Sequence, residues 1–414
     1  MLNFTNVFCT IIFTLFSFNA FAQTDRIAAV TIIENKSDTI IFPSIIDTAQ
    51  QTDVKDILRS ILKRKAVNNI NDKKSSLSVL PGINYTPSSG FGISASANLN
   101  YFASEDPKQK LSMVYALLSY NLKKQTDFTL YSILWTKKNN YGFQGTFWSL
   151  QNAEYTYGLG SLTKNNKKDL LSYSFTRFYE SVLKKIYGNI FAGIGYKLDY
   201  HYSIIEGGNM DGSISDFSKY GSRKRTTSSG LSYDFLFDTR SNSINPLRGT
   251  YIDFVYSPKS KWLGSDDNWQ SYQVDARKYL NLPAHSGNVL AFWSLLSFTS
   301  GSAPYLDLPA TGWDYQQKSS RGYIQGRYRG KNMLYFESEY RFSLTNNGLL
   351  GAVVFANTES FSGLLNKGFE KFLPAAGGGI RIKLDKRSAL NASLDYGVGI
   401  NRSKGFFFNV GEVF

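Results

Sequence analysis

The 414-residue chain has very little cysteine and histidine, and this excludes most enzymatic sites. Cys9 is the only cysteine, and His201 and His285 are the only histidines. One thiol near the N-terminus rules out a disulfide framework, a thiolate metal site and a cysteine nucleophile in the rest of the chain. Neither histidine has a serine and an orienting polar group in register beside it. Since no glycine-rich phosphate loop or metal-ligand spacing is present either, we expect no enzyme activity, no metal and no cofactor.

Long hydrophobic runs are also missing after Ala22, so that no segment there can cross a membrane as a helix. The apolar run Val7–Phe18 and the sequence Ala20-Phe21-Ala22 before Gln23 instead predict a signal peptide over residues 1–22. No lysine or arginine precedes this run, which leaves an uncleaved anchor helix as the alternative, although the run is short for one.

Aromatic residues and positive charge are abundant. Aromatics make up 15% of the chain, with 27 tyrosines and 31 phenylalanines, as suits the interfacial girdles of a membrane barrel. The net charge is +14 and the mean hydropathy is −0.25. Because the lysines and arginines are scattered over expected turns and loops, we expect attraction to outer-membrane lipid and lipopolysaccharide, and no nucleic-acid partner.

From about Ser76 onward the sequence alternates between apolar and polar residues in segments of roughly ten residues, the length of a tilted transmembrane strand. Clear examples are 91–103, 111–122, 189–202 and 334–344. About sixteen such segments follow one another to Phe414. They predict an all-β fold over residues 76–414, a 16-stranded antiparallel transmembrane β-barrel in the bacterial outer membrane. A soluble β-sandwich is the alternative.

The connectors between these segments alternate in length. Asp385–Arg387, Thr345–Gly348, Leu282–Gly287 and Pro107–Gln109 are short. The opposite connectors are long: Gln151–Lys167, Ser203–Arg225, Pro258–Asn268, Ser300–Asn332 and Thr358–Leu373. Long extracellular loops and short periplasmic turns are typical of outer-membrane barrels, and a C-terminus on the periplasmic side fits this order.

The last nine residues, FFFNVGEVF, read as a closing strand. Phe406, Phe408, Val410 and Phe414 share one face, which we expect to face lipid and to form one side of a seam with the first strand, about Leu77–Thr86. Glu412 falls in the same row, near the periplasmic edge, where a charge can reach water.

Charged residues recur on the opposite face of the predicted strands. Glu337, Glu339 and Arg341 alternate with apolar residues, and Arg381 and Asp395 lie on the polar faces of later strands. Since a charge that faces lipid costs several kcal/mol, these side chains must point into the lumen. Most of them are expected to form a solvated lining.

The longest connector carries the motif that indicates a family. Ser300–Asn332 contains Ser-Arg-Gly-Tyr at 320–323 and follows the eleventh predicted strand. These features resemble the BamA/TamA superfamily of bacterial surface antigen barrels, in which the sixth extracellular loop folds into the lumen. The resemblance implies that Arg321, Gly322 and Tyr323 form the tip of that loop.

Other segments match the same family in order. Asp238-Thr-Arg240, followed by Pro246 and Gly249, resembles its turn after the eighth strand, and Glu339-Tyr340-Arg341 resembles its acidic strand after the loop. A buried guanidinium requires carboxylate partners in good geometry. We therefore expect Arg321 to bridge to Glu339, with Asp395 as a second partner. Asn357 stands where the family has an aspartate, which puts part of the docking network in doubt.

The segment before the barrel, residues 23–75, departs from the family because it is too short for a POTRA domain. Val54, Ile57, Leu58, Ile61 and Leu62 form one apolar stripe within 53–65, which predicts a short basic amphipathic helix. This periplasmic helix is expected to lie on the inner leaflet or to plug the barrel from below, and a frayed linker is the alternative.

These features favour an accessory factor in outer-membrane protein insertion or protein translocation. Its partners would be unfolded outer-membrane proteins or a periplasmic or lipoprotein partner. Two alternatives remain: a passive or gated pore, and a barrel that anchors or exports a separately encoded partner.

Overall fold

The computed structural model describes residues 51–61, 75–86, 90–106, 108–240, 242–284, 286–363, 368–386 and 388–414. All of them belong to one compact unit, Ile45–Phe414. The expected signal peptide (1–22), most of the 23–75 segment and His285 lie outside the described residues. No helix in the described part of the chain is long and apolar enough to cross a bilayer.

The described residues form sixteen strands in one antiparallel sheet, which confirms the predicted fold class. The first eight strands are β1 Ser75–Thr86, β2 Gly90–Phe102, β3 Leu111–Asn121, β4 Thr126–Trp135, β5 Tyr141–Thr156, β6 Asp169–Tyr187, β7 Ile190–Glu206 and β8 Thr226–Asp238. The other eight are β9 Gly249–Lys259, β10 Trp269–Asn281, β11 Val289–Gly301, β12 Asn332–Ser343, β13 Leu350–Phe361, β14 Leu373–Asp385, β15 Leu390–Gly399 and β16 Lys404–Val410. Two short helices, α2 Val54–Ile61 and α3 Asp216–Gly221, accompany the sheet.

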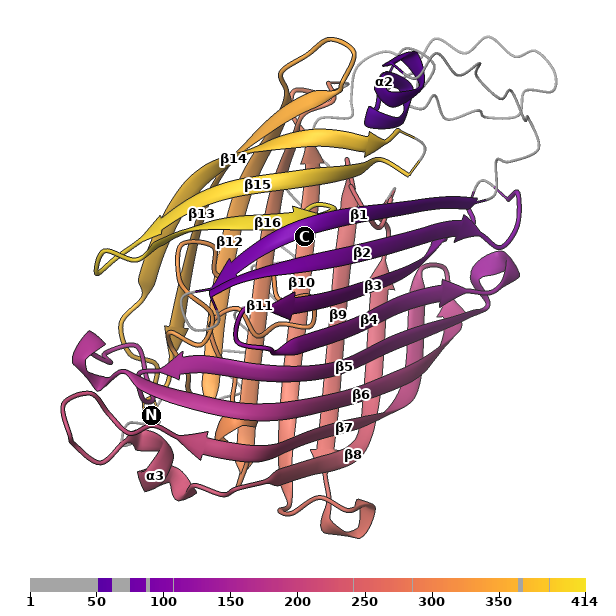
Figure 1. The fold of residues 1–414 in the computed structure, drawn as a ribbon. Coiled ribbons are helices and arrows are strands. Elements are labelled where there is room, and N and C mark those ends of the chain that lie inside the picture. The colour runs from indigo at the N-terminus through magenta and orange to yellow at the C-terminus, as the bar shows by residue number, and fades with distance from the viewer. Residues whose placement is uncertain are drawn as a thin grey trace, which may run out of the picture. The chain divides into compact units, whose positions relative to one another are not determined.

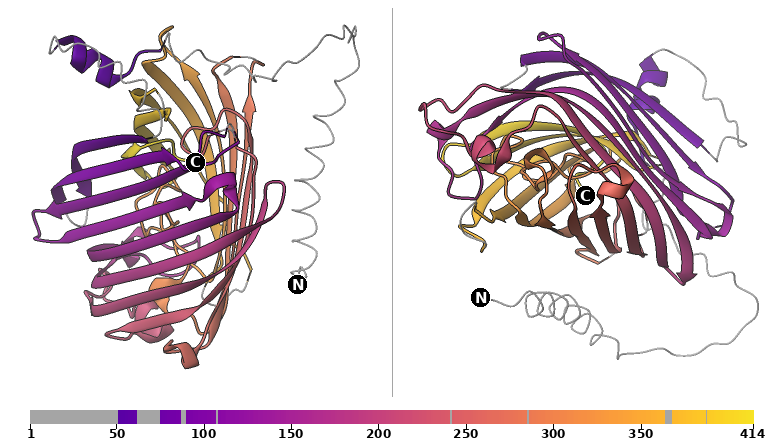
Figure 2. Two further views of the ribbon diagram at one scale, coloured as in Figure 1. Left: turned by 90° about the vertical axis from the view of Figure 1, so that its right-hand side faces the viewer. Right: turned by 90° about the horizontal axis from the view of Figure 1, so that it is seen from below.

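Each strand pairs with the next one in sequence, and the sheet curls round so that β1 lies beside β16 (Figures 1 and 2). Leu80 of β1 and Val410 of β16 pack against the same apolar cluster. Leu77, Val79, Ile93, Phe235 and other large apolar side chains are exposed on the outward face. The alternation of the sequence therefore places apolar residues outside and polar ones inside, as expected.

The connectors have the predicted pattern, although several strands continue beyond their expected ends. β5 runs to Thr156 and β7 to Glu206, so that their outer loops span 157–168 and 207–225. The longest connector, residues 302–331, joins β11 to β12, whereas the connectors at the other end have two to ten residues, with 239–248 the longest of them. The first two outer connectors, 87–89 and 122–125, are short as well.

The prediction for the C-terminal strand is wrong at its last residues. β16 ends at Val410, and Phe406 and Phe408 are exposed on its outward face as expected. Gly411 then adopts a φ of 93°, which turns the chain away from the strand. Glu412 and Phe414 are consequently buried, at 4% exposure each, and do not face lipid.

The predicted amphipathic helix is present as α2, Val54–Ile61. The described residues of the expected 53–65 are helical from Val54 onward, and residues 62–65 lie outside the described chain. α2 contacts β14, at the end of the sheet where the short turns lie. None of its residues is buried, although Asp53 just before it is.

Candidate functional site in the barrel lumen

The loop of residues 302–331 supplies two of the largest fully buried side chains in the described part of the chain. Arg321 and Arg329 are both 1% exposed, and Tyr323 and Tyr328 are buried beside them. Tyr323 and Tyr328 pack in one apolar cluster with side chains of β10–β14. The loop is thus folded against the inner face of the sheet, as the sequence predicts.

Arg321 lies among three carboxylates. Its guanidinium contacts Asp395 on β15 at 2.6 Å, Glu339 on β12 at 2.5 Å and Glu337 on the same strand. All four side chains are buried. The guanidinium also lies 3.7 Å from the centroid of the Phe355 ring, where a cation–π contact adds to the ion pairs. The structure therefore brings together Arg321, Glu339 and Asp395, and adds Glu337, which sequence reasoning did not assign to Arg321.

A second layer of ion pairs supports these acids. Arg381 contacts Asp395 at 2.5 Å and Glu412 at 2.7 Å, while Arg341 contacts Glu339 and lies 3.8 Å from Glu412. Three guanidiniums thus face four carboxylates in a continuous buried network, in which Glu337 alone depends on Arg321 for its positive partner. Such a network is costly to assemble and is disrupted strongly when one member is removed.

The residues after β16 complete the network, which explains why the C-terminal strand ends early. Arg341 donates to the carbonyl oxygen of Phe414 at 2.6 Å, and Lys318 donates to that of Glu412 at 2.7 Å. The Phe414 ring packs against Trp293 and Tyr279, with ring centroids 5.2 and 6.2 Å apart. An acid and an aromatic ring that were expected to face lipid or water instead fill the lumen.

Glycine at the loop tip permits close contact with β14 and β15. Gly322 has a φ of 114°, and a Cβ there would lie 2.6 Å from Cβ of Ala375. A Cβ on Gly397 would in turn meet the backbone nitrogen of Gly322 at 2.7 Å. Next to the glycine, the Tyr323 hydroxyl donates to the carbonyl of Pro374 at 2.7 Å and accepts from the amide of Ile400. The Arg-Gly-Tyr tip therefore fits a groove that only small residues leave open.

Hydrogen bonds to β13 also hold the loop around its tip. Ser320 and Thr311 donate to Glu359 of β13 at 2.6 and 3.0 Å. Asn357, which replaces the expected aspartate, donates to the carbonyl oxygen of Arg321 at 2.8 Å. An amide can donate this bond and an ionised aspartate cannot, so the departure from the family pattern has a structural use here.

A second anchor holds the loop to β5. Arg329 contacts Glu154 at 2.8 Å and donates to the backbone carbonyls of Leu306 and Leu308 within its own loop. Trp313 donates to the other oxygen of Glu154, also at 2.8 Å. Arg321 thus fixes the loop to β12 and β15, and Arg329 fixes it to β5.

A third buried group lies where the loop begins. Asp307 accepts from Ser228 at 2.5 Å and lies 3.5 Å from Nδ1 of His201. Burial, followed by the charge of Asp199, raises the pKa of Asp307 to about 7. His201 stacks on Phe175 with ring centroids 4.1 Å apart, and the serine is bonded to the aspartate directly. In a serine–histidine–aspartate triad the histidine lies between the serine and the aspartate, whereas here the aspartate lies between the serine and the histidine.

A cavity of about 1050 Å³, lined by both polar and apolar side chains, remains beside the docked loop. Hydroxyl and amide side chains of β2–β5 form one wall, including Ser96, Asn98 and Thr146. β16 and the middle of β1 border it, so that the cavity reaches the seam. Lys318 lies on its edge, where burial, followed by the charge of Arg277, lowers the pKa of the lysine to about 8.

The turn between β8 and β9 crosses toward the turn between β14 and β15. Asn242 and Asn245 donate to the carbonyls of Ser388 and Ala389 at 3.2 and 3.4 Å. At its start Asp238 is held by Arg240 at 2.9 Å and by Lys110 at 3.0 Å. The segment that resembles the family's Asp-Arg turn therefore bridges strands that are far apart in the sheet.

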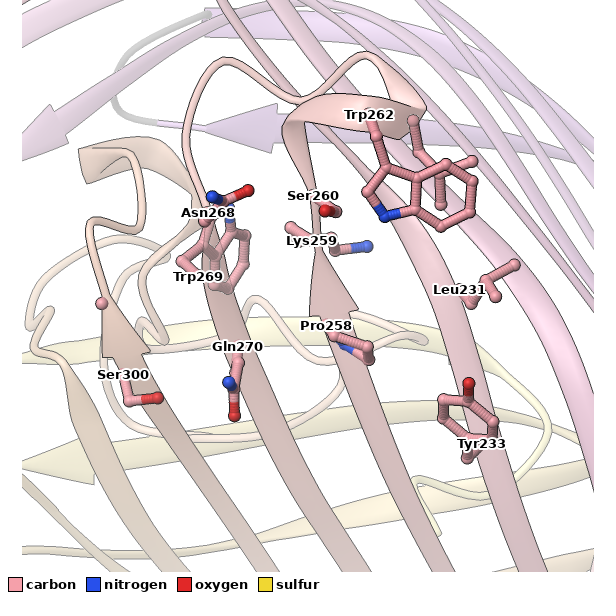
Figure 3. Close-up of a pocket in the computed structure, with 12 residues that line it drawn as sticks. Leu231, Tyr233, Pro258, Lys259, Ser260, Trp262, Asn268, Trp269, Gln270 and Ser300 are labelled. Atoms are coloured by element: carbon pink, nitrogen blue, oxygen red, sulfur yellow. The ribbon is translucent and has the colours of Figure 1, made fainter.

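A separate pocket of about 480 Å³ lies at the outer-loop end of β8–β11 (Figure 3). Trp262, which is 76% exposed, stands over it, with Leu231, Tyr233, Pro258 and Gln270 around it. It shares no residue with the Arg321 network.

Comparison with known proteins supports the fold. The BamA structure from Haemophilus ducreyi lacking POTRA domains 1–3 superposes with a TM-score of 0.50 at 14% identity, over 82% of this chain and 69% of that one. CdiB from Escherichia coli superposes with a TM-score of 0.52 at 8% identity, over 81% of this chain and 62% of that one. CdiB from Acinetobacter baumannii superposes with a TM-score of 0.49 at 10% identity, over 82% of this chain and 60% of that one. The chain therefore spans less than two thirds of either CdiB chain. No protein-family model and no curated protein matches the sequence.

Proposed function

We propose that the protein is an outer-membrane barrel that acts as an accessory factor in the insertion or translocation of other proteins. The fold is shared with BamA and CdiB barrels, and the sequence resembles the BamA/TamA superfamily in its loop motif. Function resides in sites and not in folds, so the proposal depends on the lumen and the seam.

The observation that carries the proposal is the combination of a loop docked inside the lumen and a short edge strand. Arg321 and Arg329 hold the loop inside the barrel with ion pairs to three strands. β16 has only seven residues, Lys404–Val410, and the chain then turns inward. An edge strand with unpaired backbone groups is a template for another strand. A client segment is therefore expected at the seam between β1 and β16.

A gated pore is the second candidate, because the cavity beside the loop has a volume of about 1050 Å³ and one wall of hydroxyl and amide side chains. In that case the loop would act as the gate and solutes would pass through the lumen. The two candidates use different exits: the seam for proteins and the lumen for solutes.

The test uses purified protein in liposomes. A test barrel protein, supplied unfolded, should reach its protease-resistant form faster with the protein than in empty liposomes. The test variant is Arg321→Ala, which should no longer accelerate folding of the barrel protein. No acceleration by the wild-type protein, together with steady uptake of small sugars, would favour the pore.

A further inference from the structure

The segment Gln51–Ile61, which we call the strap, lies across the end of the seam where the short turns are. The ladder between β15 and β16 stops at the pair Ala392–Val410. Because β16 ends there, the start of β1 reaches past it to the last residue of β14. The strap occupies this junction, at the end of β14 in Figure 1.

On the β14 side the strap is held by charged contacts. Lys386, in the turn after β14, donates its backbone amide to Asp53 at 3.0 Å and its ammonium to Asp56 at 2.8 Å. Lys383 donates to the Gln51 side chain at 2.7 Å. Burial acts to raise the pKa of Asp56, but the hydrogen bond and charge of Lys386 outweigh it and lower the pKa.

One lysine links the strap to both sides of the seam. Lys55 contacts Asp385 of β14 at 2.5 Å and donates to the Ser76 hydroxyl of β1 at 3.5 Å. Ser76 donates to the same Asp385 carboxylate, which is almost fully buried. β1 and β14 are therefore joined through Asp385, and the charge of Lys55 offsets part of the cost of burying this carboxylate.

Apolar packing follows the same junction. Val54 of the strap packs against a cluster that includes Leu384, Leu390, Leu80 and Val410. This cluster draws on β1, β14, β15 and β16, the strands on both sides of the seam. The later residues of α2 take no part, since Ile57, Leu58 and Ile61 are 37%, 51% and 70% exposed. The contacts of the strap are thus concentrated at its beginning, and the large apolar side chains of α2 are exposed.

We propose that the strap is an autoinhibitory latch, which holds the start of β1 against β14 and has to release before the seam opens. The proposal rests on the proposed function, because a latch is needed only if the seam opens. It differs from a plug, since the strap contacts the ends of the strands and the seam junction. The strap also differs from a free linker, because its first six residues, 51–56, have defined partners.

Hydrogen–deuterium exchange of the full-length protein in liposomes tests the latch. Lys55→Ala should raise the exchange rate of amides in residues 75–82 and 404–410 about tenfold, because the strap loses its contacts with Asp385 of β14 and Ser76 of β1. Arg59→Ala is the matched control: it lies on the same helix, its only described ion pair is with Asp56, and its side chain is 49% exposed. Arg59→Ala should leave the exchange rates of residues 75–82 and 404–410 unchanged. Lys55→Arg, which keeps the positive charge, should give exchange rates near those of the wild-type protein.

A disulfide provides the second test. In Lys55→Cys/Asp385→Cys, oxidation should abolish acceleration of client folding and reduction should restore it. Equal exchange in Lys55→Ala and Arg59→Ala, or full activity of the oxidised protein, would overturn the latch. If the wild-type protein is inactive toward clients, the proposed function fails, whereas the exchange comparison still decides whether the strap holds the seam.

Discussion

Replacement of Arg321 by alanine should release the loop of residues 302–331 from the lumen. The guanidinium contacts Glu337, Glu339 and Asp395, all of them buried. Removing it leaves these carboxylates in a site of low dielectric. Breaking a buried ion pair by removing one partner costs about 3–5 kcal/mol.

Arg321→Ala breaks three ion pairs, but its free-energy cost should stay within the range for one pair, because two of the three acids keep another cation. Glu339 retains Arg341 and Asp395 retains Arg381. Glu337 is the exception: its remaining bond is from the Tyr335 hydroxyl. At about 1.4 kcal/mol per factor of ten, the docked state should lose roughly 100-fold to 3000-fold in population relative to the undocked one.

Limited digestion with proteinase K and heat-modifiability on gels measure the effect. Arg321→Ala should be cut within 302–331 under conditions where the wild-type loop is intact, and the barrel should unfold at a lower temperature. Arg321→Ala/Glu337→Gln should recover part of the loss, since the unpaired acid is neutralised. Unchanged protease resistance and unchanged heat-modifiability in Arg321→Ala would refute the reasoning.

Three further outcomes are expected. Gly322→Ala should weaken loop docking by about 1–3 kcal/mol, because the residue is held at positive φ against Ala375, whereas Gly368→Ala, with open space around it, should not change digestion. Glu154→Gln should expose the Arg329 half of the loop to protease and leave the Arg321 half protected, as mapped by mass spectrometry of the fragments. The pKa of Asp307 is raised to about 7 in the folded state, above its unfolded value near 3.8, so the folded state binds more protons between these values. The free energy of unfolding should therefore fall as the pH rises from about 4 to 7. Thermal unfolding should show a melting temperature that decreases across this range, and Asp307→Asn should weaken this pH dependence.

Much of the barrel is predictable from the sequence because one period sets the whole pattern. Alternation identifies which residues face lipid, and connector length identifies which end of each strand is which. Glu339 and Asp395 could be selected as partners for Arg321 because charged residues had to face inward and two strands lay near the loop. The loops after β5 and β7 were expected to begin at 151 and 203, whereas the strands continue to Thr156 and Glu206, where the alternation of apolar and polar residues is weaker.

The remaining contacts depend on positions that periodicity does not determine. Glu337 shares a face and a strand with Glu339, but only the height of the loop tip decides that both reach Arg321. Glu412 was assigned to the lipid face by counting through Gly411, where a positive φ ends the strand. The pairing of Arg329 with Glu154 spans 175 residues and depends on the path of the loop across the lumen. The glycine at 411 was the available signal that the alternation should stop.

Electrical recording from the purified protein in planar bilayers tests the central claim most directly. If the loop docked through Arg321 closes the lumen, proteins have to pass through the seam. Wild-type protein should therefore show no steady open conductance, and deletion of residues 305–329 should produce one. A large, steady conductance in the wild-type protein, unchanged by the deletion, would contradict the account and make the barrel a pore.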